Sequence, residues 1–318
     1  MTTAALGTPP GDRSRGAAPP RHEAVLHSSP AHLARLLAPR IREAVVARDV
    51  VVAVLDPETE TSLRTELGAV AGDVEFRDPA DVHAVPAFTV AARFARTSRR
   101  ADRAGERALV IAQHLPRLTV DDPGHWARLD IALNIAIAGL PVTVLCPCAR
   151  SDPAEVGTTH PLITADAGTT ASETYRPPSE AVIDYPPPPP PDLGPPAAEM
   201  TFGASRLATV RHVVADVAGR AGLAPDRVAD LVLAVNELAS NSVEHGPGSG
   251  RFRLWTGTPV VAEISDDGGE MDAPFPGLAM PPPAGARGRG LWLASELCDV
   301  LQVWSDADAT VVRVTVSP

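Results

Sequence analysis

The chain has 318 residues, a formal net charge of −11 and a hydrophobic fraction of 44%. At about 100–200 residues per domain, this length predicts two domains, each long enough to bury a core. The negative charge disfavours direct binding to nucleic acid or to an anionic membrane surface. No run approaches the ~20 apolar residues of a membrane span. Every basic residue is arginine, which excludes a catalytic lysine, a Schiff base and a Walker-type lysine.

Residues 1–20 are rich in Gly, Pro, Ala and Arg and lack the apolar core of a signal peptide, which predicts a disordered tail. Three cysteines without a CxxC pair favour a reducing cytoplasm over a disulfide scaffold, so we expect a cytoplasmic protein. Cys146 and Cys148 follow the apolar run 141–145. We favour two buried thiols at a strand end, and a metal or redox site is the alternative.

Residues 22–166 alternate between strand-like and helix-like patterns. Strands are predicted at 50–55, 108–113 and 142–145, and helices at 32–47, 59–70 and 126–138. Short apolar strands that alternate with helices are typical of a mostly parallel sheet covered on both faces, so we predict an α/β domain. This stretch contains no dinucleotide-binding, P-loop or zinc-protease motif. His114 follows a predicted strand, where we favour a structural role over a ligand site.

The clearest domain boundary is a run of six prolines at 186–191, directly after Tyr185. Such a run favours a polyproline II spacer of about 19 Å, and a ligand for a proline-recognition module is the alternative. We assign residues 169–198 to a linker and 199–318 to the second domain. Few contacts are expected between the two halves, which would then be separable.

The second domain contains a predicted helix at 226–245. Val235, Leu238 and Ser242 lie on the face that we expect to pack into a core. Glu237 and Asn241 lie on the opposite face, a carboxylate and an amide one helical turn apart. In isolation, such a pair is typical of a solvated helix surface, so its interpretation depends on the motifs further along the chain.

A carboxylate stands at the end of a strand-like run after this helix, in the sequence Ser265-Asp266-Asp267-Gly268-Gly269. Asp266 can accept a hydrogen bond from an amine, and the glycines let the backbone lie close to a planar ligand. By itself, such a turn is common and mostly structural. Four antiparallel strands are predicted around it and beyond, at 251–255, 260–265, 300–304 and 309–316.

A glycine-rich segment, Arg287-Gly288-Arg289-Gly290, precedes a predicted helix at 291–298. Free backbone N–H groups and the positive end of the helix dipole bind phosphate at such a helix start. The two arginines can add charge-assisted hydrogen bonds to a polyphosphate.

The order of these motifs resembles the Bergerat ATP-binding fold, which histidine kinases, gyrase and Hsp90 share. Residues 236–246 look like its N box, 264–268 like its G1 box and 288–291 like its G2 box. Within the superfamily, the short domain and residues 287–293 resemble most closely the anti-sigma-factor serine kinases of bacteria. The resemblance covers residues 200–318 and implies an α+β two-layer ATP-binding domain.

The resemblance also implies roles for single residues. Asn241 would coordinate the Mg²⁺ that bridges the ATP phosphates, and Glu237 would act on the attacking serine hydroxyl as a general base. Asp266 would accept a hydrogen bond from the adenine amine, and Gly268 would allow close approach. Phosphate would be bound at the start of the last helix by Arg287, Gly288, Arg289 and Gly290.

Two features depart from the family pattern. Glu270 stands where the G1 box often has its second glycine, so we expect a tighter pocket on that side. The expected ATP lid, within 272–286, is short, rich in proline and without lysine.

The first half, residues 21–166, resembles the MEDS type of sensory domain, named for methanogens and methylotrophs. The matching stretches are 21–26, 129–138 continuing into 142–147, and 159–162. The resemblance implies a small-molecule ligand for this half. The residues by themselves predict only an α/β domain without visible catalytic machinery.

We therefore expect a bacterial transcription regulator in which a sensory domain, residues 21–168, controls an ATP-dependent protein serine kinase, residues 199–318. It would transfer the γ-phosphoryl group of ATP to a serine of an anti-anti-sigma partner and hold an RNA polymerase sigma factor inactive. A non-catalytic, nucleotide-dependent binding switch is the alternative. The catalytic part of a histidine kinase is disfavoured, because no paired dimerisation helices precede residue 200. The sequence leaves open whether the chain forms a homodimer, which ligand the sensory domain binds and in which direction regulation acts.

Overall fold

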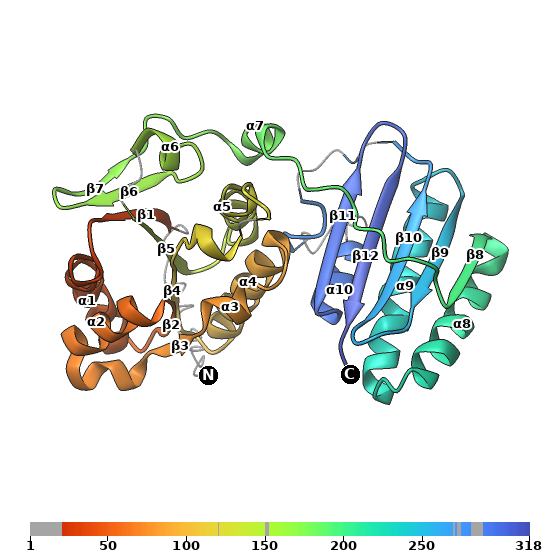
Figure 1. Ribbon diagram of the computed structural model, residues 1–318, viewed down its shortest axis with the longest axis horizontal. Helices are drawn as coiled ribbons and strands as arrows, with labels where there is room; N and C mark the ends of the chain where they lie inside the picture. Colours follow the sequence, from red (N-terminus) through yellow and green to blue (C-terminus); the bar gives the residue numbers. More distant parts are fainter. Residues whose placement is uncertain (1–20, 120, 150–152, 270, 272–274, 281–288) are drawn as a thin grey trace, which may run out of the picture.

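The computed structural model describes residues 21–119, 121–149, 153–269, 271, 275–280 and 289–318. The chain forms two halves that lie side by side, each built on its own sheet (Figure 1). The N-terminal half is α/β with a mostly parallel sheet, and the C-terminal half is α+β with an antiparallel sheet. The predicted fold class is therefore confirmed. The predicted disordered tail, residues 1–20, lies outside the described residues.

The N-terminal sheet has seven strands in the order β3-β2-β4-β5-β1-β6-β7. Every neighbouring pair is parallel except β6 and β7. All five residues of β4 are buried, because helices cover both faces of the sheet, and this explains the unbroken apolar runs in the sequence. The strands are β1 Arg21–His27, β2 Val50–Val54, β3 Glu75–Arg77, β4 Ala108–Ala112, β5 Val142–Ala149, β6 Leu162–Ala165 and β7 Gly168–Ala171.

Helices α1 and α2 pack on one face of this sheet, and α4 and α5 pack on the other. Side-chain caps begin the first two: Ser29 accepts from the His32 N–H, and Asp56 accepts from the Thr59 N–H. Helix α4 was not among the predicted elements. The helices of this half are α1 Pro30–Val46, α2 Pro57–Leu67, α3 Pro79–Val82, α4 Ala87–Arg103, α5 His125–Ala136, α6 Pro153–Gly157 and α7 Pro178–Ala181.

The C-terminal sheet has five antiparallel strands in the order β11-β12-β10-β9-β8. Its helices lie on one face, where the buried residues of α9 pack against those of the strands (Figure 1). Helix α8 and strand β8 were not predicted from the sequence. The elements are β8 Ala198–Gly203, α8 Leu207–Arg220, α9 Pro225–Glu244, β9 Ser249–Trp255, β10 Val260–Asp266, α10 Arg289–Leu297, β11 Val300–Ser305 and β12 Thr310–Val316.

The proline-rich segment runs across the outer face of the C-terminal sheet (Figure 1). Trp304 Nε1 donates to the Pro188 carbonyl at 2.6 Å, and Trp255 Nε1 donates to the Gly194 carbonyl at 2.9 Å. A third donor, Arg313 Nη1, lies 2.6 Å from the Pro191 carbonyl. Proline offers a carbonyl acceptor but no N–H, so indole and guanidinium donors suit this segment. The segment is thus packed on a domain, unlike a free spacer.

Helix α4 of the first half contacts α10 and β11 of the second half. Arg99 Nη2 lies 2.5 Å from Glu296 Oε1, and Arg96 Nη2 donates to the Ser295 carbonyl at 3.0 Å. Arg93 donates to the carbonyl of Asp299, just after α10, at 3.2 Å. The expectation of few contacts between the halves is therefore wrong.

None of the described helices combines the length and hydropathy that a membrane span requires.

Candidate functional site

Helix α9 carries the two polar residues that the sequence singled out. It begins with Pro225 at its first turn and ends where the N–H groups of His245 and Gly246 both donate to the Asn241 carbonyl. A Cβ on Gly246 would lie 2.8 Å from the Ser242 carbonyl oxygen, so this exit from the helix requires glycine. Glu237 and Asn241 are half-buried on the surface of α9 that faces the start of α10.

Gly290, in the first turn of α10, lies directly against this pair. A Cβ on Gly290 would be 3.1 Å from both Asn241 Nδ2 and Glu237 Oε2. The absence of a side chain therefore lets the start of α10 approach the carboxylate and the amide closely. The structure thus brings together Glu237, Asn241 and Gly290, although Gly290 is more than forty positions from the other two in the sequence.

Asp266 stands at the end of β10 and is held by two protein donors. Ser242 Oγ donates to Asp266 Oδ2 at 2.5 Å, and the Gly268 N–H donates to Oδ1 at 3.0 Å. Each carboxylate oxygen can accept a further hydrogen bond, so Asp266 keeps capacity for a ligand donor. A Cβ on Gly268 would lie 2.7 Å from Asp266 Oδ1, which explains the glycine at this position.

Ser242 is a site residue that the sequence analysis missed. The helical pattern placed it on the packing face, and it is buried. Its hydroxyl joins α9 to Asp266, while its neighbour Asn241 faces Gly290. One turn of α9 therefore connects the carboxylate at the strand end to the glycine at the helix start. Its position directly after Asn241 is the feature of the sequence that could have identified Ser242 as a site residue.

Asn241, near Gly290, fits a magnesium ion. Beside the Glu237 carboxylate it offers an amide oxygen, and oxygen ligands are those that Mg²⁺ prefers. Both side chains are half-buried, so solvent and ligands can reach them.

Part of the predicted phosphate end lies outside the described residues, namely Arg287 and Gly288, and so does Glu270. Arg289 is the first residue of α10 and is exposed. Of the expected lid, residues 275–280 are described. Gly277 has a φ of 82° and packs so close to α10 that a Cβ would lie 2.7 Å from Leu291 Cβ.

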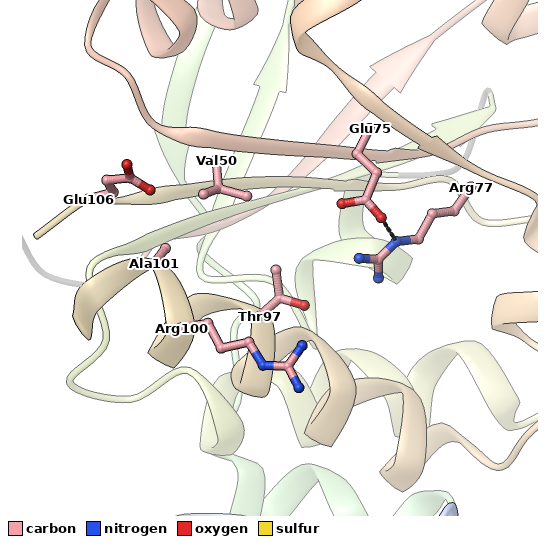
Figure 2. A pocket seen from close by; sticks show the side chains of 7 residues that line it. All are labelled: Val50, Glu75, Arg77, Thr97, Arg100, Ala101 and Glu106. Carbon is pink, nitrogen blue, oxygen red and sulfur yellow. Dashed lines mark hydrogen bonds and ion pairs between the residues drawn. The ribbon is translucent and has the colours of Figure 1, made fainter. Parts of the chain in front are cut away.

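A separate hollow of about 330 Å³ lies in the N-terminal half (Figure 2). Its charged groups have both signs, and Arg77 Nε pairs with Glu75 Oε1 at 2.8 Å. It shares no residue with the site on α9, β10 and α10, and nothing in its lining indicates chemistry. The lining residues are Val50, Glu75, Arg77, Thr97, Arg100, Ala101 and Glu106.

Residues 201–316 match the model of a family described as the histidine kinase-like ATPase domain. The match covers the whole arrangement of α9, β10 and α10, and it supports ATP binding by the C-terminal half.

A search of curated proteins found none that matches the chain. Among solved structures, the chain is similar to the crystal structure of the RsbU and RsbW domains of Rv1364c from Mycobacterium tuberculosis. The identity is 20% and the TM-score 0.28, over 38% of this chain and 32% of that chain. The match thus spans about a third of the length of that chain.

Proposed function

We propose that the C-terminal half binds Mg·ATP and phosphorylates a serine of an anti-anti-sigma partner, and that it sequesters an RNA polymerase sigma factor. The observation that carries the proposal is the placement of Glu237 and Asn241 against Gly290, in a domain that matches the histidine kinase-like ATPases. The N-terminal half, residues 21–168, would act as the MEDS-like sensory domain that controls this activity. Residues 169–198, which begin within β7 of the N-terminal sheet, would act as the connection between the halves.

The adenine end of the proposed site is Asp266. Its two oxygens are held by Ser242 and Gly268, so the carboxylate is oriented before a ligand arrives. It would accept a hydrogen bond from the exocyclic amine, and the open backbone at Gly268 would lie against the base. Preorganisation of this kind lowers the entropy lost on binding.

The phosphate end is the start of α10. Backbone N–H groups at a helix start favour anions, and Gly290 leaves room for a close approach. Asn241 would hold Mg²⁺ through its amide oxygen. In the proposal, phosphate is also bound by Arg287, Gly288 and Arg289. Bound Mg·ATP would supply a phosphoryl group that a hydroxyl can attack.

Glu237 would accept the proton of the attacking serine hydroxyl at a carboxylate oxygen. Its Oε2 lies against the start of α10, beside the residue assigned to the metal. A positioned general base contributes typically about 10²–10⁴-fold to a rate. Nucleotide binding alone does not need this carboxylate, so its placement favours a kinase over a switch that only binds nucleotide.

Control by the first half is supported by α4. Its arginines bind Glu296 and the Ser295 carbonyl, both in α10, the helix whose other end forms the phosphate site. A change in the N-terminal half that moves α4 would therefore act on α10 directly.

The experiment that tests the proposal is phosphosite mapping on native partners. The full chain is copurified with its partners from native cells and incubated with Mg·ATP, and the phosphorylated residues are mapped by mass spectrometry. The proposal expects a new phosphoserine on a copurified partner and a sigma factor among the captured proteins. If the chain binds ATP but transfers phosphate to none of its partners, the nucleotide-dependent binding switch is the correct function.

A further inference from the structure

A second group of polar side chains is buried in the N-terminal half. Its members are His22 of β1, Asp130 of α5, Cys146 of β5 and His160 in the segment between α6 and β6, and none is more than 3% exposed. Each offers one nitrogen, oxygen or sulfur atom, and these four atoms all lie within 4.8 Å of one another. We refer to these four residues as the buried cluster.

The distances inside the buried cluster are those of metal ligands. His22 Nε2 lies 3.3 Å from Cys146 Sγ and 3.8 Å from Asp130 Oδ1, and His160 Nε2 lies 3.4 Å from the same Oδ1. Ligands at about 2.0–2.3 Å from a tetrahedral zinc ion are separated by roughly 3.3–3.6 Å. These three pairs are close to this spacing, and all four atoms lie within 4.8 Å of one another.

Hydrogen bonds to the outer ring nitrogens fix how both imidazoles face this centre. His160 Nδ1 lies 2.9 Å from the Val156 carbonyl, which can only accept, so Nδ1 carries the proton. His22 Nδ1 lies 2.9 Å from Asn134 Oδ1, and Asn134 Nδ2 donates to the Thr159 carbonyl at 2.7 Å, which sets the amide orientation. Histidine ligands of metals are held in this way, with the second nitrogen donating to the protein.

The inner nitrogens of both imidazoles face the Asp130 carboxylate and the Cys146 sulfur. His160 Nε2 is buried and has no hydrogen-bond partner among the described residues, and it lies 3.4 Å from Asp130 Oδ1. His114 Nε2 lies 3.1 Å from the same oxygen. A cation at the centre would satisfy both imidazoles, the carboxylate and the sulfur, and a divalent ion would balance a carboxylate and a thiolate.

We propose that His22, Asp130, Cys146 and His160 bind one divalent transition-metal ion, Zn²⁺ in the first place. Two imidazoles, one thiolate and one carboxylate form a donor set that suits tetrahedral zinc. Binding replaces the thiol proton of Cys146, which is released to solvent. The ion would join two strands, a helix and a loop of the N-terminal half, and it is independent of the nucleotide site.

An access route reaches the buried cluster. A cavity of about 560 Å³ is lined by Asp130 and Thr159, together with His114, Cys148 and Tyr185. One proposed ligand, Asp130, thus lines this cavity.

Cobalt substitution of the full chain tests this proposal. The purified protein is stripped with a chelator and titrated with Co²⁺ in the absence of nucleotide. We expect one Co²⁺ per chain, intense visible bands of a tetrahedral ion, near-ultraviolet absorption from thiolate-to-cobalt charge transfer, and displacement of cobalt by one equivalent of Zn²⁺. A wild-type protein that binds no Co²⁺, or binds it without the charge-transfer band, would overturn the proposal.

Two cysteine variants assign the thiolate. Cys146→Ser should abolish the charge-transfer band, whereas Cys148→Ser, two residues further along the same strand, should keep it. Retention of the band in Cys146→Ser would show that the ligand set is wrong. Asp130→Asn is a further variant, and it should weaken Zn²⁺ binding by at least tenfold in competition with a chromogenic chelator. The Co²⁺ titration of the wild-type protein decides the proposal by itself. The test therefore does not depend on whether every variant folds.

Discussion

The two halves of the chain arrange their polar groups in opposite ways. At the C-terminal site, Glu237, Asn241 and Asp266 are half-buried, and protein donors already hold Asp266. In the buried cluster, two imidazoles, the Asp130 carboxylate and the Cys146 thiol lie within 4.8 Å of one another and are at most 3% exposed. Buried polar groups without partners are costly, whereas half-exposed groups can use water between ligands. The first arrangement suits a ligand that comes and goes, and the second suits a resident ion.

The largest effect expected from this comparison concerns Glu237. Glu237→Gln keeps the shape of the side chain and removes its basicity, so phosphate incorporation into the partner should fall by about 10²–10⁴-fold while ATP affinity stays the same. Radiolabel transfer and calorimetric titration measure the two quantities.

Glu244→Gln is the matched control, because Glu244 is exposed near the end of the same helix. It should transfer phosphate at the wild-type rate. If Glu237→Gln transferred phosphate at the wild-type rate, Glu237 would not be the general base. This result would not bear on the fold.

The contact between the halves should have a moderate effect on stability. Arg99 is 8% exposed and pairs with Glu296, so Arg99→Ala leaves a partly buried carboxylate with a weaker partner. We expect the free energy of unfolding to fall by about 1–2 kcal/mol in urea denaturation. Arg103→Ala, at an exposed position of the same helix, should change it little. Equal stability of the two variants would show that α4 and α10 do not support each other.

A further effect is expected from pH, and it should arise in the first half. Burial, with a contribution from His125 and His114, lowers the pKa of His83 from 6.5 to about 3. The unfolded chain takes up a proton near pH 6.5 and the folded chain does not, so stability from this group is complete above pH 6.5 and is lost as the pH falls towards 3.

His83→Phe keeps an aromatic ring beside Trp126, 4.6 Å away between ring centroids in the wild type. This variant should lose less stability than wild type between pH 6.5 and pH 4, as measured by thermal unfolding. A substitution at an exposed position, His245→Gln, should keep the wild-type pH dependence. An unchanged pH profile in His83→Phe would contradict the account.

The residues of the proposed nucleotide site could be selected from the sequence because each of its motifs is local. Asn241, Asp266 and Gly290 each stand in a short segment whose residue types carry the chemistry, and the order of segments suggested the fold. Ser242 was not predicted as a site residue, because a helical pattern does not distinguish a small polar residue on the packing face from the other packed residues. At Cys146 a metal site was the alternative interpretation of the sequence, but the other members of the buried cluster could not be named, because His22 and Cys146 lie 124 positions apart. Parallel pairing of β1 with β5 brings them together, and no local pattern records that pairing.

The contacts between the halves could not be predicted either. A run of prolines indicates an extended segment, but the indole and guanidinium donors that bind its carbonyls come from strands β9, β11 and β12. Helix α4 is amphipathic, but its sequence does not show which part of the chain its arginines contact. Its role depends on Glu296, nearly 200 residues away.

The most direct test of the nucleotide site is calorimetric titration of the full chain with ATP in the presence of Mg²⁺. Asp266→Asn should weaken binding by about 1–3 kcal/mol through loss of a charge-assisted hydrogen bond, while Asp267→Asn, at the exposed neighbouring position, should bind like wild type. Equal affinity of Asp266→Asn and wild type, with both proteins folded, would contradict the assignment of Asp266 to the adenine end.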